Sequence, residues 1–153
     1  MRAIRLHARG GPERLVYEDA PLPDPAAGEA LLRVYAAGIT PTELTWSTTY
    51  ETPDGNERLP TIPGHDVSGV VEAIGPGVSD VSPGDAVYGL VAFPRDGSAA
   101  EYVAVRAADL ALKPLSLDHA PLTTRGRKRL PQTILRSVMC RRRPPLRAAT
   151  SCV

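Results

Sequence analysis

The sequence predicts a mainly β protein, a small β-barrel or sandwich with one or two short helices, followed by a poorly ordered basic tail. Three observations support this class. Sixteen prolines and 13 glycines make up about a fifth of the 153 residues, as in chains with many turns. Short apolar segments recur between those turns at the spacing typical of a small barrel or sandwich. The charge balance changes sharply near residue 120.

The first strands are expected at residues 1–7, 15–18 and 29–38. Residues 1–7 show a two-residue alternation, and residues 15–18 form a second short apolar segment. The segment 29–38 is the clearest strand, because Leu32 and Val34 fall on one face together with Ala36.

A short helix is expected to begin at Thr40 and to end near residues 46–49. The Thr40 hydroxyl can cap the helix, and Pro41 suits the first helical position. Glu43 stands where the acid of a capping box is found. The polar residues 52–58 then form a loop.

Three more strands are expected, at residues 65–74, 86–91 and 99–105. Turns rich in glycine and proline separate them. A further helix is expected to start with Ser116 as its cap and Asp118 in its first turn. Pro121 follows within a few residues and is expected to break this helix.

The composition is that of an ordinary globular chain, with 42% hydrophobic and 23% charged residues. No apolar run approaches the roughly 18–20 residues of a membrane helix, and the N-terminus lacks the apolar segment of a signal peptide. The two cysteines, Cys140 and Cys152, both lie in the tail, so the rest of the chain has no thiolate for a metal. We therefore expect a cytoplasmic protein with no membrane partner.

The charge is divided unevenly along the chain. Residues 1–120 hold all 17 acidic residues and nine of the 18 basic ones, a net charge of −8. Residues 121–153 hold the other nine basic residues and no acid, a net charge of +9. Such asymmetry indicates segments with different origins or roles. We expect one domain over residues 1–119 and a separate basic tail over residues 120–153.

Five segments resemble, in order and spacing, the N-terminal GroES-like half of the medium-chain dehydrogenases/reductases. This superfamily includes alcohol dehydrogenases and quinone oxidoreductases. The segments are AAGITP at residues 36–41, PGHDVSGVV at 63–71, GPGV at 75–78, GDAVYG at 84–89 and AEYV at 100–103. The resemblance covers about residues 1–119 and implies a GroES-like, partly open barrel that carries the substrate side of the catalytic cleft.

The resemblance implies a zinc-independent oxidoreductase that transfers a hydride from NADP(H) to a quinone, an enone or a related carbonyl. In the family, a Rossmann domain of roughly 150 residues binds the cofactor. Only 33 residues follow Ala120, and no glycine motif of that domain is found among them. We therefore expect the cofactor domain to be absent and this chain alone to be inactive, as after a truncation or frameshift near residue 120.

Three candidate site residues follow the strand 29–38. Thr40 lies where zinc-independent members often have Asn, which implies a catalytic and cofactor-binding hydroxyl; its alternative role is the helix cap. Trp46 and Tyr50 lie where these members often place an aromatic ring against the substrate. The resemblance implies that Trp46 lines the cleft and that the Tyr50 phenol donates a proton. The alternative is that both are ordinary surface or core aromatics.

His65 and Asp66 form the second group of candidates. His65 matches a zinc ligand of the zinc-dependent members, but the cysteine that would accompany it is missing near residues 38–40. We therefore expect no metal and place His65 in the substrate cleft. Asp66 lies where the zinc-independent branch often has an acid and is a catalytic candidate. Nothing in the sequence shows whether Glu43 and Asp66 meet.

The basic tail has two interpretations. Its change of composition at about residue 120, inside an expected helix, is typical of out-of-frame translation of a GC-rich gene. Alternatively, the clusters at residues 125–129 and 141–143 make a basic arm that binds nucleic acid or another anionic partner, without any enzyme activity.

Overall fold

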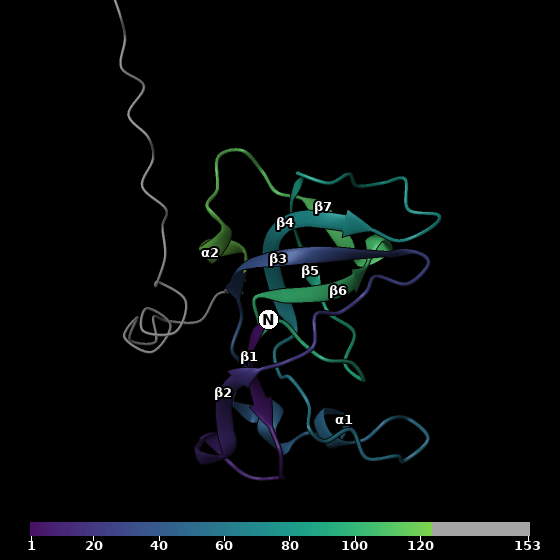
Figure 1. The fold of residues 1–153 in the computed structure, drawn as a ribbon. Coiled ribbons are helices and arrows are strands. Elements are labelled where there is room, and N and C mark those ends of the chain that lie inside the picture. The colour runs from purple at the N-terminus through teal and green to yellow at the C-terminus, as the bar shows by residue number, and fades with distance from the viewer. Residues whose placement is uncertain (124–153) are drawn as a thin grey trace, which may run out of the picture.

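The computed structural model describes residues 1–123, which form two β-sheets (Figure 1). The larger sheet has five strands in the order β6-β3-β4-β5-β7, and β1 pairs with β2 in the smaller one. The strands are β1 (Arg2–Leu6), β2 (Leu15–Asp19), β3 (Glu29–Ala37), β4 (Asp66–Ile74), β5 (Ala86–Leu90), β6 (Tyr102–Arg106) and β7 (Leu110–Leu112). Residues 124–153, with most of the predicted basic tail and its anion-binding alternative, lie outside the described residues.

Helices are few and short. In the described part of the chain, two α-helical turns, α1 (Ser47–Tyr50) and α2 (His119–Leu122), accompany three 3-10 turns, η1 (Pro12–Arg14), η2 (Pro41–Thr45) and η3 (Ala107–Asp109). The predicted mainly β class with one or two short helices is thus confirmed. Over residues 1–123, no helix is long and apolar enough to cross a membrane.

The five-stranded sheet is strongly curved but open. Every strand pairing in it is antiparallel, and β6 and β7 form its two edges. The register between β3 and β4 shifts at Leu31/Leu32 and again at Val34/Ala36. Such irregularities bend a strand and increase its twist, which lets the sheet wrap around its own core.

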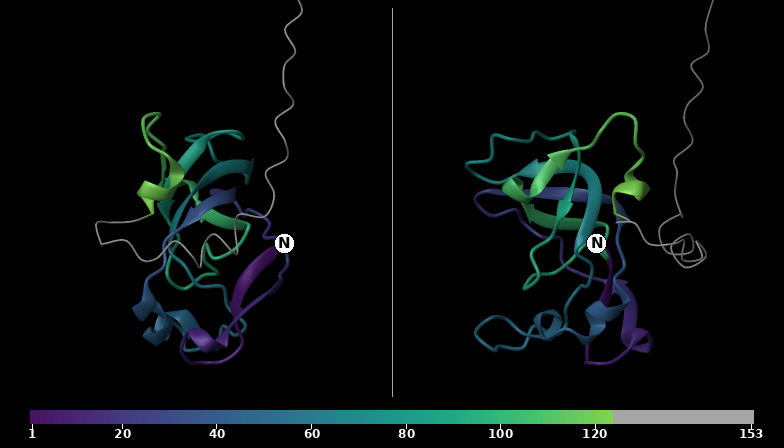
Figure 2. Two further views of the ribbon diagram at one scale, coloured as in Figure 1. Left: turned by 90° about the vertical axis from the view of Figure 1, so that its left-hand side faces the viewer. Right: turned by 180° about the vertical axis from the view of Figure 1, so that it is seen from behind.

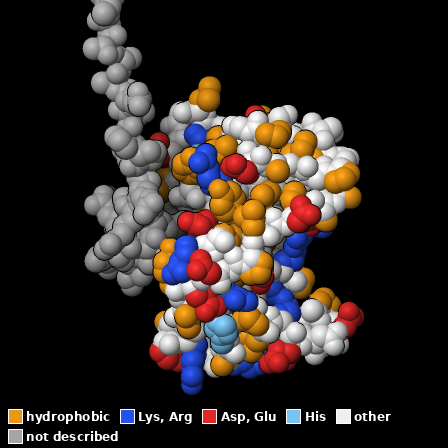
Figure 3. Space-filling model, in the orientation of Figure 1, with side chains coloured by type: hydrophobic (Ala, Val, Ile, Leu, Met, Phe, Trp, Pro, Cys, Tyr) orange, Lys and Arg blue, Asp and Glu red, His pale blue; other side chains and the backbone are white. Residues whose placement is uncertain are grey.

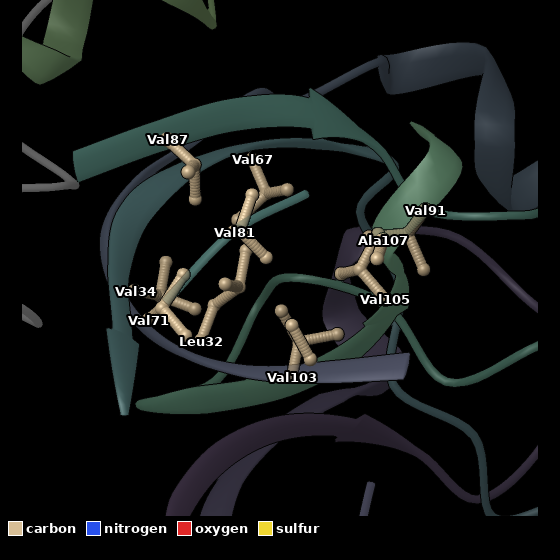
Figure 4. Packing of buried hydrophobic residues seen from close by; sticks show 11 residues of the cluster. Leu32, Val34, Val67, Val71, Val81, Val87, Val91, Val103, Val105 and Ala107 are labelled. Carbon is tan, nitrogen blue, oxygen red and sulfur yellow. The ribbon is translucent and has the colours of Figure 1, made fainter. Parts of the chain in front are cut away.

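Valines fill the space inside this curve. Figure 4 shows side chains from β3, β4, β5 and β6 pointing toward one another around Val81, which comes from the loop between β4 and β5. The predicted inward face of β3 is confirmed, because Leu32, Val34 and Ala36 are all buried. Each fully buried side chain of this size contributes about 1.5–3 kcal/mol to folding.

The smaller sheet lies with α1 at one end of the molecule in all three views (Figure 1, Figure 2). Single bridges, Ala3↔Ala100 and Leu6↔Thr61, join β1 to the rest of the chain. Figure 3 shows acidic and basic side chains side by side over this end. The β1–β2 sheet also carries the cross-strand ion pair Arg5–Glu18.

Two helix predictions differ in detail from the structure. The helix expected to begin at Thr40 is divided into η2 and α1, and the Thr40 side chain makes no capping hydrogen bond. The later helix begins after Asp118 and not after Ser116. Pro121 lies within α2. Proline is tolerated there because backbone N–H groups in the first turn of a helix have no partner within the helix. Sequence analysis also missed β7, which is only three residues long.

Candidate functional site

Glu43 is the buried acid at the centre of the candidate site. The η2 turn directs its side chain inward, where it is only 5% exposed. Its Oε1 atom accepts a hydrogen bond of 2.6 Å from the backbone N–H of Gly64. The predicted capping box is therefore wrong: the carboxylate bonds to a donor 21 residues away, and not to the start of its own turn.

His65 lies directly before β4 and joins this acid to the end of β5. The imidazole side chain is 9% exposed. Its Nδ1 lies 3.2 Å from the carbonyl oxygen of Val91, and its Nε2 lies 3.3 Å from Oε1 of Glu43. The sequence raised a Glu43–Asp66 pair as an open question, whereas the structure pairs Glu43 with His65.

Two aromatic rings pack against His65. The Trp46 ring stacks at 6.0 Å with an interplanar angle of 18°, and the Phe93 ring lies 4.4 Å away at 49°. Trp46 and Phe93 meet edge to face at 5.7 Å. We call Trp46, His65 and Phe93 the aromatic wall. Phe93 is 41% exposed, so the wall extends from the buried Glu43 to the surface.

The turn before His65 requires a glycine. Gly64 has a φ of +100°, in the left-handed region that side chains disfavour. A Cβ atom there would also come within 2.8 Å of the Ser98 hydroxyl oxygen. The backbone of Ser98 in turn donates a hydrogen bond of 2.9 Å to the Gly64 carbonyl. This close packing fixes the position from which the imidazole projects.

Thr40 and Tyr50 flank the segment that carries Glu43 and Trp46. Thr40 is half-buried at the start of η2. Tyr50 is 2% exposed, and its hydroxyl donates to the carbonyl of Leu44 at 2.8 Å. That proton is thus engaged by the backbone in this conformation. The catalytic roles predicted for both residues remain predictions.

Asp66 lies in different surroundings from His65, although the two are adjacent. Its side chain packs against Gly38, where an added Cβ would come within 2.8 Å of Oδ2. Asp66 also borders a hollow of about 430 Å³, lined further by Tyr88, Gly89, Leu90, Ala108, Asp109, Leu110, Ala111 and Leu122. The catalytic role predicted for Asp66 stays a prediction.

A second histidine cluster connects α2 to the large sheet. The Ser68 hydroxyl donates to the Val87 carbonyl at 3.0 Å, so the His119 Nδ1–H donates to the Ser68 oxygen at 2.7 Å. The His119 ring stacks on Tyr35 at 4.9 Å. Burial lowers the pKa of His119, and nearby Lys113 lowers it further, while Asp118 opposes both effects.

The side chains around His65 do not complete a metal site. Residues 1–123 contain no cysteine and no group of three His, Cys, Asp or Glu side chains that could hold a metal ion. A catalytic zinc site uses three protein ligands. Glu43 and His65 alone therefore do not fit such a centre.

Sequence reasoning missed Phe93 and assigned Glu43 to the wrong contact. Phe93 is the only phenylalanine in the chain and lies in a loop, where no periodic pattern marks it. Glu43 satisfied a local helix-start rule, and that rule concealed its long-range contacts. The one available signal for Phe93 was the presence of a large apolar side chain within a polar turn.

Comparisons with known proteins agree with this architecture. Residues 26–115 match the model of the alcohol dehydrogenase GroES-like domain. A quinone oxidoreductase of Rattus norvegicus is 41% identical over 90 residues, which are 58% of this chain and 26% of that protein. The chloroplastic NADPH-dependent alkenal/one oxidoreductase of Arabidopsis thaliana is 38% identical over 106 residues, 65% of this chain and 27% of that protein.

A solved structure of similar fold supports the same family. The quinone oxidoreductase of Coxiella burnetii superposes with a TM-score of 0.72 at 27% identity, over 80% of this chain and 40% of that one. The chain thus spans about a quarter of the length of the curated relatives just named. Because the family model covers more than half of its residues, the chain belongs to the alcohol dehydrogenase GroES-like domain family, within the medium-chain dehydrogenase/reductase superfamily.

Proposed function

We propose that residues 1–119 form the substrate side of an NADP(H)-dependent, zinc-independent oxidoreductase that reduces quinones, enones or related carbonyls. The observation that carries this proposal is the aromatic wall with Glu43 and His65 at its buried end. The wall presents aromatic rings, set at angles of 18°, 49° and 63° to one another, beside a polar group. Conjugated carbonyl compounds are flat and have one polar end, so they match both features.

The relatives' names support the same substrate class, since they include quinone and alkenal/one oxidoreductases. One of these names also specifies NADPH. In the proposed reaction the cofactor supplies the hydride, while the protein positions the substrate and stabilises charge. We place Trp46 and His65 against the substrate. Thr40 is assigned to the rim of the cleft, as a hydrogen-bonding hydroxyl for substrate or cofactor.

The proposal includes zinc independence and inactivity of this chain on its own. The donor set of residues 1–123 supports the first, because it offers no third ligand beside Glu43 and His65. The pairing of the large sheet supports the second. All its strands are antiparallel, whereas a dinucleotide-binding domain is built on a mostly parallel sheet. We therefore propose that NADP(H) is bound mainly by a domain that residues 1–123 do not provide.

A chimera tests the proposed function. Residues 1–119 are joined to the cofactor-binding part of the Rattus norvegicus quinone oxidoreductase. We expect this protein to oxidise NADPH only when 1,4-naphthoquinone or an enone is added, and to keep its rate in a zinc chelator. A chimera that binds NADPH but leaves every quinone and enone unreduced would refute the proposal.

The 153-residue chain alone provides a second test. We expect neither saturable NADPH binding nor NADPH oxidation with the same acceptors. NADPH binding with a micromolar dissociation constant would contradict the proposed need for another domain.

A further inference from the structure

The helical turn α1 is held at its C-terminal end by Arg58. This helix has only four residues, and a single turn is not stable on its own. The last carbonyl groups of a helix have no partner within the helix, so they need donors from elsewhere. The Nη1 atom of Arg58 donates to the carbonyl of Thr48 at 2.6 Å and to that of Thr49 at 3.1 Å. Its backbone N–H donates to the carbonyl of Tyr50 at 2.8 Å, so one residue holds the end of α1.

The guanidinium of Arg58 is buried, although it carries a charge. Its side chain is only 9% exposed. Burial lowers the pKa of Arg58, and the carboxylate of Asp96, 3.9 Å from Nη2, opposes this effect. That carboxylate is 60% exposed and too distant for a hydrogen bond, so it contributes little. A cation that has left water must be hydrogen-bonded, and the bonds to the α1 carbonyls therefore hold the guanidinium in place.

Thr49 connects this anchor to Trp46. The backbone N–H of Thr49 donates to the carbonyl of Trp46 at 3.2 Å. The hydroxyl of Thr49 is buried and donates to the carbonyl of Glu43 at 2.7 Å. Trp46 is the residue that ends η2 and precedes α1, so a shift of α1 moves its backbone. The residue that Arg58 holds is thus the same one that holds the segment from Glu43 to Trp46.

The position of the Trp46 ring depends on that backbone. The ring lies nearly parallel to the imidazole of His65, with centroids 6.0 Å apart, and meets Phe93 edge to face at 5.7 Å. His65 directly precedes β4 and Phe93 follows β5, so both belong to other parts of the chain than α1. The packing of an aromatic pair depends on the separation and angle of its rings. The aromatic wall therefore keeps its shape only while α1 stays in place.

We propose that Arg58 is a positioning residue of the aromatic wall: it holds α1 so that Trp46 faces the substrate, and it thereby determines how tightly a quinone or enone binds. This inference rests on the proposed function, because that function places Trp46 against the substrate. The hydrogen bonds that Arg58 donates go to backbone carbonyls of α1, so it acts on the substrate through Trp46. Substrate affinity, and not hydride transfer, is the quantity that it controls.

Nuclear magnetic resonance tests the anchor in the unsubstituted chain. The full chain is labelled with ¹⁵N, and Arg33 serves as the internal control because its side chain is 49% exposed. We expect the Nη protons of Arg58 to exchange slowly with water, since Nη1 donates to two carbonyls in a buried place. Those of Arg33 should exchange rapidly. Rapid exchange at Arg58 overturns the proposal, even if every variant fails to fold.

Near-ultraviolet circular dichroism tests whether Arg58 sets the position of Trp46. Trp46 is the only tryptophan in the chain, so the tryptophan bands report its surroundings alone. We expect Arg58→Gln to weaken these bands at a temperature where the variant is still folded. Arg58→Lys keeps a donor for the same carbonyls and should keep more of the signal, while Arg33→Gln should leave it unchanged. A lower melting temperature with unchanged bands would show a role in stability only and would refute the proposal.

Quinone binding tests the consequence for the substrate. Quenching of Trp46 fluorescence by 1,4-naphthoquinone reports binding at the wall of the full chain. We expect Arg58→Gln to weaken this binding about two- to tenfold, the range of one aromatic contact, and Arg33→Gln to leave it unchanged. In the chimera described above, Arg58→Gln should raise the KM for the quinone by a similar factor with little change in kcat.

This inference and the proposed function fail in different ways. If 1,4-naphthoquinone binds the unsubstituted chain and Arg58→Gln with equal affinity, the positioning role of Arg58 is refuted while the substrate wall stands. If the quinone does not quench Trp46 saturably in the unsubstituted chain, the substrate wall fails, and the role of Arg58 in substrate binding fails with it.

Discussion

Two histidine–glutamate pairs in this molecule differ mainly in burial. His7 and Glu18 lie on the β1–β2 end, with Nε2 2.6 Å from Oε1 and side chains 49% and 30% exposed. His65 and Glu43 are 3.3 Å apart and 9% and 5% exposed. Solvent screens the first pair, so its contact is worth little despite the shorter distance. The second pair has lost its water, so each member depends on the other.

The largest effect is expected from breaking the buried pair. Glu43→Ala removes the partner of His65 and the acceptor of the Gly64 N–H. Breaking one side of a buried pair costs about 3–5 kcal/mol. We expect a loss of this size in the free energy of unfolding, measured by urea denaturation of the full chain. A loss below about 1 kcal/mol would show that the pair is not desolvated as described.

A smaller effect is expected at the turn that aims His65. Gly64→Ala forces a side chain into a φ of +100° and against the Ser98 hydroxyl. Strain of this kind costs about 1–3 kcal/mol. Ser98→Ala relieves the contact but not the backbone strain, and it also removes the 2.8 Å hydrogen bond that the hydroxyl donates to the Asp66 carbonyl. The double variant is therefore compared with Ser98→Ala alone, and in that background Gly64→Ala should still cost part of the original loss. No cost in that background would mean that the contact alone causes the effect. All variants are measured by urea denaturation.

Sequence reasoning could predict the strands and some residues of the site, but not the others. The strands were predictable because Leu32 and Val34 repeat at the two-residue period that a half-buried strand requires. His65 and Trp46 were found because they belong to recognisable segments. Their partner Phe93 was not, since it meets them only after β4 and β5 have paired. Glu43 was misassigned because a local pattern and a long-range contact competed for one carboxylate, and the contact prevailed.

A pH-dependent effect of intermediate size is expected at His119. Burial lowers its pKa in the folded protein, so the folded state binds fewer protons than the unfolded state. The corresponding stability is therefore fully present above the ordinary histidine pKa of about 6.5, and it is lost as the pH falls from there through the lowered pKa of the folded protein. We expect the chain to lose less stability between pH 7.5 and 5 in His119→Gln than in the unsubstituted protein. Equal pH dependence in both proteins would contradict a role for His119.

The smallest effect is expected at the exposed pair, and it completes the comparison. Glu18→Ala removes the acid that His7 and Arg5 share on the β1–β2 end. Exposed pairs contribute about 0.2–1 kcal/mol, and salt screens them further. We expect a loss within that range in low salt and a smaller one in 1 M sodium chloride, measured by urea denaturation. A loss as large as that of Glu43→Ala would show that contact distance, and not burial, determines the strength of these two pairs.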